Sequence, residues 1–270
     1  MKWGIVCKPK AKKSISLAKE VYKFLQNYGE VFVEKELARA AELPGFSFQD
    51  LNKKADVVIT IGGDGTILMA LSQIEKPIFA INSGGMGFLS EVESKYTIGG
   101  LTKLVEGDYN IEERAKLKVT IDGKRLDDAA NEVTVQSDRI AKILYFKLFI
   151  NEELIETMGA DGVIVATPTG STSYALSVGG PIVDPSINAM IIAPLAPFKL
   201  SARPWIVPLE RKVSIALLAK NKESRLVIDG RMSEPVTPQS EILITGSEKK
   251  ARFVRFGESF YQMVRLKLMR

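Results

Sequence analysis

Apolar residues in the first hundred positions alternate between short runs and stretches at helical spacing. Continuous apolar runs of this length are typical of strands covered on both faces, as in a parallel sheet. We expect strands at Trp3–Cys7, Val31–Val33, Val57–Ile61 and Pro77–Ile81, with Leu51–Ala55 leading into the third. We expect helices at Ser14–Tyr28 (with Ser14 as a possible cap), Lys35–Leu43, Ile67–Gln73 and Tyr96–Glu106, the last ended by Gly107. This alternation predicts right-handed βαβ units.

After about residue 108 the pattern changes to alternating apolar and polar positions, which is typical of half-buried strands. Residues 116–121 alternate in this way, and Asp122-Gly123 directly after them is a strong hairpin turn. Further strands are expected at 131–135, 142–150, 154–158, 162–166, 213–218, 225–228, 241–244 and 252–256. The predicted fold class is therefore an α/β N-terminal, Rossmann-like domain plus a β-rich C-terminal domain. We expect the first domain to span residues 1–108 and the second to span residues 109–250. The C-terminal segment 251–270 is expected to pack back on the first domain.

The chain is organised around residues 57–66, where a β-branched run ends in Gly62-Gly63-Asp64-Gly65-Thr66. The glycines free the backbone to turn sharply, and apolar residues at helical spacing follow, so Thr66 is expected near a helix start. A strand, a glycine turn and a helix N-terminus together direct N–H groups at an anion, typically phosphate. A carboxylate there is explained if Asp64 takes a proton from a hydroxyl or holds a metal. The alternative is a simple turn in which Asp64 bonds its own backbone.

A second glycine cluster, residues 82–89 around Gly84 and Gly87, follows the next predicted strand. Ligands bind beyond the carboxyl ends of strands in open α/β sheets, so two such loops strengthen the prediction of a site. Phe88 offers an aromatic surface there, although a core position is the commoner use of phenylalanine.

Polar residues gather at three places in the second half. Asn131-Glu132 opens a strand and, taken alone, reads as ordinary surface. Asp161-Gly162 precedes another strand. The hydroxyl-rich turn 167–174 can bond sugar hydroxyls and base edges, or can equally cap a helix.

The amino-acid composition limits the kinds of substrate and the catalytic groups that are possible. The 270 residues carry a net charge of +5 with dispersed Lys and Arg, which suits anionic, phosphorylated substrates. There is no histidine, so any base must be a carboxylate, lysine, tyrosine or water. Cys7 is the single cysteine, which fits a cytoplasmic protein without disulfides. We see no signal peptide, no membrane span and no P-loop of the G-x-x-x-x-G-K-[ST] kind.

The ordered set of motifs resembles the ATP-dependent NAD kinases nearly end to end, in a form like that of archaeal or thermophile members. The motifs are Gly62–Thr66, Asn82–Gly84 with Gly87–Leu89, Asn131-Glu132, Asp161-Gly162 leading to Thr167–Thr172, Arg203-Pro204 and Asp229-Gly230. The resemblance implies phosphorylation of the 2′-hydroxyl of the adenosine ribose of NAD to give NADP. Two positions depart from the common pattern, Phe198 and Arg231, where many members carry His and Gln, so ligand contacts by these two are in doubt.

Residue by residue, the resemblance implies that Asp64 is the general base. It assigns donor phosphates to the N–H groups of Gly62, Gly63 and Gly65, the acceptor ribose to Asn131 and Glu132, and the nicotinamide side to Asp161. It places Leu68 and Phe88 at the adenine. It implies adenine and ribose contacts by Thr172, Ser173, Tyr174 and Ser177, and a contact by the backbone of Ala196. Lys142 is expected near the bound dinucleotide. It also implies Mg²⁺ or another divalent cation with ATP, no metal site made of side chains alone, and a homodimer or homotetramer.

Two other functions stay open at this point. Lipid kinases of the diacylglycerol or sphingosine type share the Gly-Gly-Asp-Gly-Thr motif, but the hydroxyl-rich turn and the lack of a membrane-seeking segment disfavour them. A silent dinucleotide sensor or nucleic-acid binder would suit the positive charge, but the dispersed Lys and Arg indicate an ordinary solvated surface. The sequence does not decide whether the phosphate donor is ATP or polyphosphate, or whether the acceptor is NAD or NADH.

Overall fold

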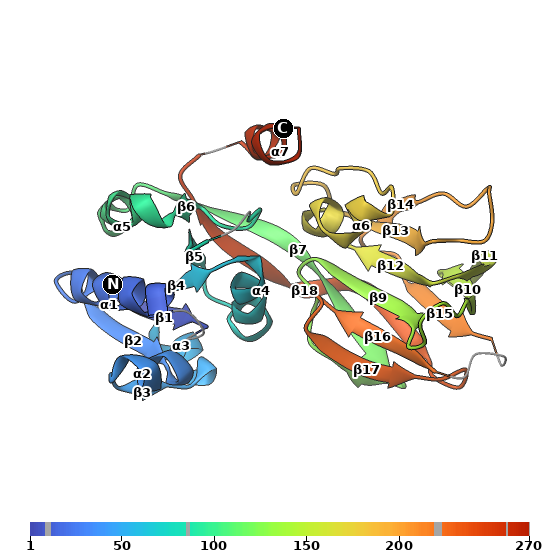
Figure 1. Cartoon of the computed structure of the whole chain (residues 1–270), viewed down its shortest axis with the longest axis horizontal. Coiled ribbons are helices and arrows are strands. Elements are labelled where there is room, and N and C mark those ends of the chain that lie inside the picture. The colour runs from blue at the N-terminus through green and yellow to red at the C-terminus, as the bar shows by residue number, and fades with distance from the viewer. Residues whose placement is uncertain (9–11, 85–86, 219–222, 258, 270) are drawn as a thin grey trace. The chain divides into compact units, whose positions relative to one another are not determined.

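The computed structural model describes residues 1–8, 12–84, 87–218, 223–257 and 259–269 (Figure 1). The chain forms two compact units, 1–113 with 251–270, and 114–250. It passes from one unit to the other within the long strands β7 (Asn110–Ile121) and β18 (Ile242–Arg255). Among the described residues, no helix is both long and apolar enough to cross a lipid bilayer.

The first unit is built on a parallel sheet in the order β18-β5-β4-β1-β2-β3, with β6 beside β5. Its strands are β1 (Lys2–Cys7), β2 (Glu30–Glu34), β3 (Gly45–Phe46), β4 (Val57–Gly62), β5 (Ile78–Asn82) and β6 (Val92–Glu93). Every residue of β4 is buried, as expected for a central strand covered on both faces. The predicted parallel α/β arrangement is confirmed.

The helices of this unit are α1 (Lys12–Leu25), α2 (Lys35–Ala41), α3 (Phe48–Lys54), α4 (Asp64–Gln73), α5 (Thr97–Glu106) and α7 (Phe260–Leu268), with a 3₁₀ turn at Ser94–Tyr96. Helices α1, α2 and α5 bury apolar faces in one core with the sheet. Gly107 ends α5 in the left-handed conformation, as predicted.

Two local predictions were wrong, and one helix was missed. Ser14 does not cap α1, because the helix starts at Lys12 and the Ser14 hydroxyl lies 3.0 Å from that of Ser83. The segment before β4 is helix α3, which Ser47 and Asp50 start with a capping box. The expected separate strands 241–244 and 252–256 are both parts of β18.

The second unit is a sandwich of two largely antiparallel sheets. Its strands are β8 (Lys124–Arg125), β9 (Glu132–Ser137), β10 (Leu144–Ile150), β11 (Glu153–Ala160), β12 (Gly162–Ala166), β13 (Ala189–Leu195), β14 (Trp205–Pro208), β15 (Val213–Leu217), β16 (Ser224–Ile228) and β17 (Met232–Val236), together with parts of β7 and β18. One sheet has the order β14-β13-β12-β9-β16-β17, and the other contains β11-β10-β15-β18 and the β7–β8 hairpin.

Alternate residues of both sheets share one apolar core, as sheet-on-sheet packing requires. The opposite face of β12 and β13 packs against the short helix α6 (Tyr174–Ser177). The predicted β-rich second domain is therefore confirmed, and the sheet face under α6 carries the hydroxyl-rich turn that follows β12.

Candidate functional site

The Gly62–Thr66 turn joins β4 directly to α4 in the first unit. Helix α4 starts at Asp64 with Gly63 as its N-cap, so Thr66 lies in the first helical turn, as expected. An added Cβ on Gly62 would collide with the Thr66 side chain, which explains why only glycine fits there. Gly65 is exposed, and an added Cβ there would meet no heavy atom within 4 Å of the described structure. The turn thus presents open backbone at the N-terminus of a ten-residue helix.

The second glycine loop lies beside the first, because β4 and β5 are parallel neighbours and Gly62 pairs with Asn82. The Asp64 carboxylate joins the two loops: Oδ2 accepts the Phe88 N–H at 2.8 Å and Oδ1 the Leu89 N–H at 3.2 Å. Gly85 and Met86 of this loop lie outside the described residues. Asp64 is half-buried and does not bond its own backbone in any described contact.

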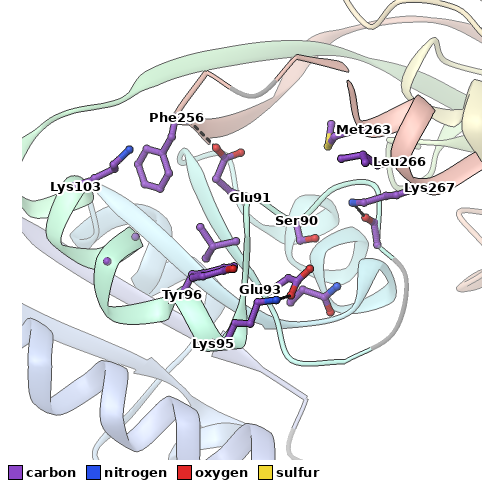
Figure 2. Close-up of a pocket in the computed structure, with 15 residues that line it drawn as sticks. Ser90, Glu91, Glu93, Lys95, Tyr96, Lys103, Phe256, Met263, Leu266 and Lys267 are labelled. Carbon is purple, nitrogen blue, oxygen red and sulfur yellow. Dashed lines mark hydrogen bonds and ion pairs between the residues drawn. The ribbon is translucent and has the colours of Figure 1, made fainter. Parts of the chain in front are cut away.

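A cavity of about 720 Å³ adjoins this loop within the first unit (Figure 2). It is bounded by the loop at Gly87 and Ser90, by α5 and by α7. Phe88 is half-buried, and Leu68 is 7% exposed on α4. The structure therefore brings Gly62, Gly63, Asp64, Gly65 and Phe88 together, and Leu68 lies about one helical turn after Asp64 on α4.

A second group of predicted residues gathers in the other unit, where strands β12, β9 and β16 are neighbours. Glu132 begins β9 and Asn131 directly precedes it, and the last residues of β12 and β16 lie at this same end of the sheet. Asp229, directly after β16, accepts the N–H groups of Ala130 (2.9 Å), Asn131 (2.8 Å) and Glu132 (3.1 Å). The sequence shows Asp229 only as part of the Asp229-Gly230 motif and gives no sign of this anchoring role.

The hydroxyl-rich turn after β12 is tied to the same edge. Thr167 Oγ1 donates to Ala130 O at 2.6 Å and accepts the Gly170 N–H at 3.1 Å. Gly170 lies so close to the Asn131 carbonyl that an added Cβ would overlap it. The turn therefore brings Ser173 and Tyr174 to Glu132, with Thr172 just before them and Ser177 at the end of α6.

The Glu132 carboxylate is buried but incompletely bonded. It is bonded by the Ser173 hydroxyl and the Tyr174 N–H, yet its Oε2 atom has no partner among the described residues, and neither has Asn131 Oδ1. Burial, with the nearby Asp229 carboxylate, raises the pKa of Glu132 to about 7. Burial also raises the pKa of Asp229, which its three N–H donors and Arg231 oppose. Buried acceptors without a partner among the described residues indicate a place for a ligand with hydroxyl donors.

The raised pKa of Glu132 predicts a pH-dependent stability. Between the ordinary value of 4.5 and about 7, the folded state binds more protons than the unfolded state. The free energy of unfolding contributed by Glu132 therefore falls as pH rises through this window, by about 3 kcal/mol in total. Glu132→Gln removes this term, so the variant should gain stability relative to wild type between pH 4.5 and 7. Urea unfolding at pH 5 and pH 8 measures the difference.

The exposed Glu210, in the same unit, provides the control. Glu210→Gln should track the wild type at both pH values. A constant offset between Glu132→Gln and wild type across the window would contradict the raised pKa.

Three predicted residues lie elsewhere. Asp161 precedes β12, at the opposite end from Thr167, which places it roughly 20 Å from that edge for a strand of this length. Ala196 follows Leu195, the partner of Gly162, and Lys142 lies two residues before Leu144, the partner of Ala160. Within the chain, these three residues gather at their own end of the sandwich and do not join Asn131 and Glu132.

The residues present fit a divalent cation carried by a phosphorylated substrate. No group of three or more His, Cys, Asp or Glu side chains able to hold a metal occurs in the described part of the chain. Mg²⁺ usually keeps several waters and binds one or two carboxylates plus substrate phosphates. The open N-terminus of α4, which can bind phosphate, beside the single carboxylate of Asp64 fits a cation held mainly by the substrate phosphates.

Comparison with known proteins gives one family over both units. Residues 3–109 match the ATP-NAD kinase N-terminal domain, and residues 130–256 match the ATP-NAD kinase C-terminal domain. The chain is 41% identical to an NAD kinase of Methanothermobacter thermautotrophicus (100% of this chain, 96% of the relative) and 41% identical to one of Thermococcus kodakarensis (99% of each).

Two solved structures are also similar. A yeast NADH kinase complexed with NADH superimposes with a TM-score of 0.92 at 25% identity, covering 100% of this chain and 87% of that one. An NAD kinase from Archaeoglobus fulgidus in complex with ATP gives a TM-score of 0.80 at 31% identity, covering 98% and 99%. The family models, the relatives and the folds agree, and this chain belongs to the ATP-NAD kinase family.

Proposed function

We propose that the protein is an NAD kinase that transfers the γ-phosphoryl group of ATP to the 2′-hydroxyl of the adenosine ribose of NAD, giving NADP and ADP. The observation that carries this proposal is the Asp64 carboxylate, fixed between two glycine loops at the carboxyl edge of a parallel sheet. Family membership supports both substrates, because the two domain families that match this chain are described as ATP-NAD kinase domains.

Asp64 acts as the general base. Its carboxylate takes the proton of the 2′-hydroxyl as that oxygen bonds to the γ-phosphorus, and the bond from the γ-phosphorus to the β–γ bridging oxygen breaks. A ribose hydroxyl is a weak nucleophile at neutral pH, and phosphoryl transfer depends mainly on alignment and on charge neutralisation. The Phe88 and Leu89 N–H groups orient the carboxylate for this step.

The N–H groups of Gly62, Gly63 and Gly65 and the N-terminus of α4 hold the donor phosphates. Mg²⁺ with the ATP neutralises phosphate charge when it is bound. Leu68 and Phe88 contribute apolar surface toward the adenine.

The second unit supplies the recognition of the dinucleotide. The free acceptors Asn131 Oδ1 and Glu132 Oε2 take hydrogen bonds from ribose hydroxyls. Thr172, Ser173, Tyr174 and Ser177 line the same edge. Asp161, with Ala196 and Lys142 at the other end of β12, serves the nicotinamide side.

We also propose a cytoplasmic homodimer or homotetramer. Self-association is supported by large apolar side chains exposed in the second unit, on the loop after β13 and on the edge strand β14. These are Phe198 (87% exposed), Leu200 (98%), Trp205 (46%) and Ile206 (53%). Contact between copies is the ordinary way to cover such a surface.

The direct test is incubation with NAD, ATP and Mg²⁺, followed by an NADP-specific dehydrogenase that reports product. We expect ATP-dependent formation of NADP. Binding of NAD in calorimetry without any product on addition of ATP and Mg²⁺ would instead identify a dinucleotide sensor, and transfer of labelled phosphate to a lipid but not to NAD would identify a lipid kinase.

A further inference from the structure

The loop that holds Asp64 is itself held by the C-terminal segment, all within the first unit. Lys267, near the end of α7, donates from Nζ to the Gly87 carbonyl oxygen (Figure 2). The same ammonium lies 5.4 Å from the centroid of the Phe88 ring. Gly87 directly precedes Phe88 and Leu89, whose N–H groups bind the Asp64 carboxylate. One cation therefore contacts both the peptide and the ring next to these donors.

The geometry around Gly87 is tight enough to transmit a displacement. A Cβ built on Gly87 would lie 2.8 Å from Asp64 Oδ1 and 3.2 Å from Ser90 Oγ. The loop backbone is thus packed directly on the carboxylate, and a shift of the Gly87–Leu89 backbone must move the Asp64 side chain or lengthen its hydrogen bonds.

The far side of the loop is fixed by a separate contact. Arg255, at the end of β18, donates from Nη1 to Leu89 O at 3.3 Å and pairs with Glu91 at 2.8 Å. Glu91 also accepts the Phe256 N–H at 2.6 Å. Arg255 is 9% exposed and belongs to the fold, whereas Lys267 is half-buried at the edge of the cavity between the loop and α7. Lys267 is therefore the contact that can be removed without opening the core.

We propose that Lys267 is a positioning residue for the phosphoryl transfer, which acts through Gly87 to keep the Phe88 and Leu89 N–H groups on the Asp64 carboxylate. This inference rests on the proposed role of Asp64 as the base. Helix α7 then has a part in catalysis, because its last turn sets the direction of a catalytic side chain just over two hundred positions earlier in the sequence.

The test compares Lys267→Met, Lys267→Arg and Arg265→Met as full-length proteins. Lys267→Met keeps the length and apolar stem of the side chain and removes the donor. We expect kcat to fall about 10- to 100-fold, the range for a misplaced catalytic group, with a much smaller change in the KM for ATP. Lys267→Arg should restore most of kcat, because it again offers a cationic donor. Arg265→Met, an exposed cation on the same helix, should behave like wild type.

A double-mutant cycle separates this inference from the proposed function. In an Asp64→Asn background, Lys267→Met should cause little further loss, because the carboxylate that it positions is gone. If Asp64→Asn abolishes turnover but Lys267→Met leaves kcat unchanged, only the positioning role is wrong. An equal additional loss in both backgrounds also overturns it, since that would indicate general damage to the unit. If Asp64→Asn itself retains full turnover, the proposed base is wrong.

Discussion

Replacing Asp64 by asparagine should lower kcat about 10²- to 10⁴-fold, the usual contribution of a positioned general base. Asparagine has nearly the same shape and keeps one oxygen that can accept the Phe88 or Leu89 N–H, so the two glycine loops should stay together. What it cannot do is take the proton of the ribose hydroxyl. NADP formation under saturating ATP and Mg²⁺ measures kcat, and calorimetry should show that NAD affinity changes by less than a few-fold.

The matched control is Asp108→Asn, which removes one negative charge from an exposed position after the C-terminus of α5 in the same unit. It should leave kcat and the melting temperature unchanged. Turnover of Asp64→Asn within threefold of wild type would remove Asp64 from the chemistry and leave it as a structural acceptor that joins two loops.

The first unit could be predicted largely from the sequence because its signals are local. A fully buried strand reads as a continuous apolar run, and β4 is one. Helix α3 was missed because it is short and buries only Leu51, so its hydrophobic pattern is weak. The better signal was Ser47 followed three residues later by Asp50, which form the capping box that starts this helix.

Strand β18 shows where local pattern reading stops. Its first half alternates buried and partly buried positions as one face of the sandwich, whereas Phe253 and Val254 are consecutive and buried in the first unit. Two patterns on one strand look like two elements, because the period of the side chains depends on what lies on each face of the sheet.

The candidate site also has a part that could be predicted from the sequence and a part that could not. The glycine turns and the acceptor pair Asn131-Glu132 carry residue types that the chemistry needs, so they could be selected from the sequence. The groups that hold them could not. Asp229 lies 98 positions from Asn131, and Lys267 lies 180 positions from Gly87. Such partners are set by the order of strands in space, which a single sequence does not give.

Asp229→Ala should have the largest effect on stability. The carboxylate accepts three buried N–H groups, from Ala130, Asn131 and Glu132. Each buried donor left without an acceptor costs about 1–3 kcal/mol, and relief of the buried charge offsets part of the sum. We expect the free energy of unfolding at pH 7 to fall by roughly 3–5 kcal/mol, which urea unfolding of the second-unit transition measures. NAD affinity should fall with it, because the released segment carries Asn131 and Glu132.

Asp229→Asn distinguishes the hydrogen bonds from the charge. Its remaining oxygen can keep the two bonds that Oδ1 makes, to Asn131 and Glu132, so its loss of stability should be less than half that of Asp229→Ala. Removing the charge should also move the pKa of Glu132 down from about 7, since the Asp229 carboxylate is one cause of that rise. Asp184→Ala, which removes a carboxylate that caps an exposed turn at Ser186, should cost less than about 1 kcal/mol. If Asp229→Ala cost no more than Asp184→Ala, water would be replacing the carboxylate, and the Asn131-Glu132 segment would owe its shape to the Thr167 turn alone.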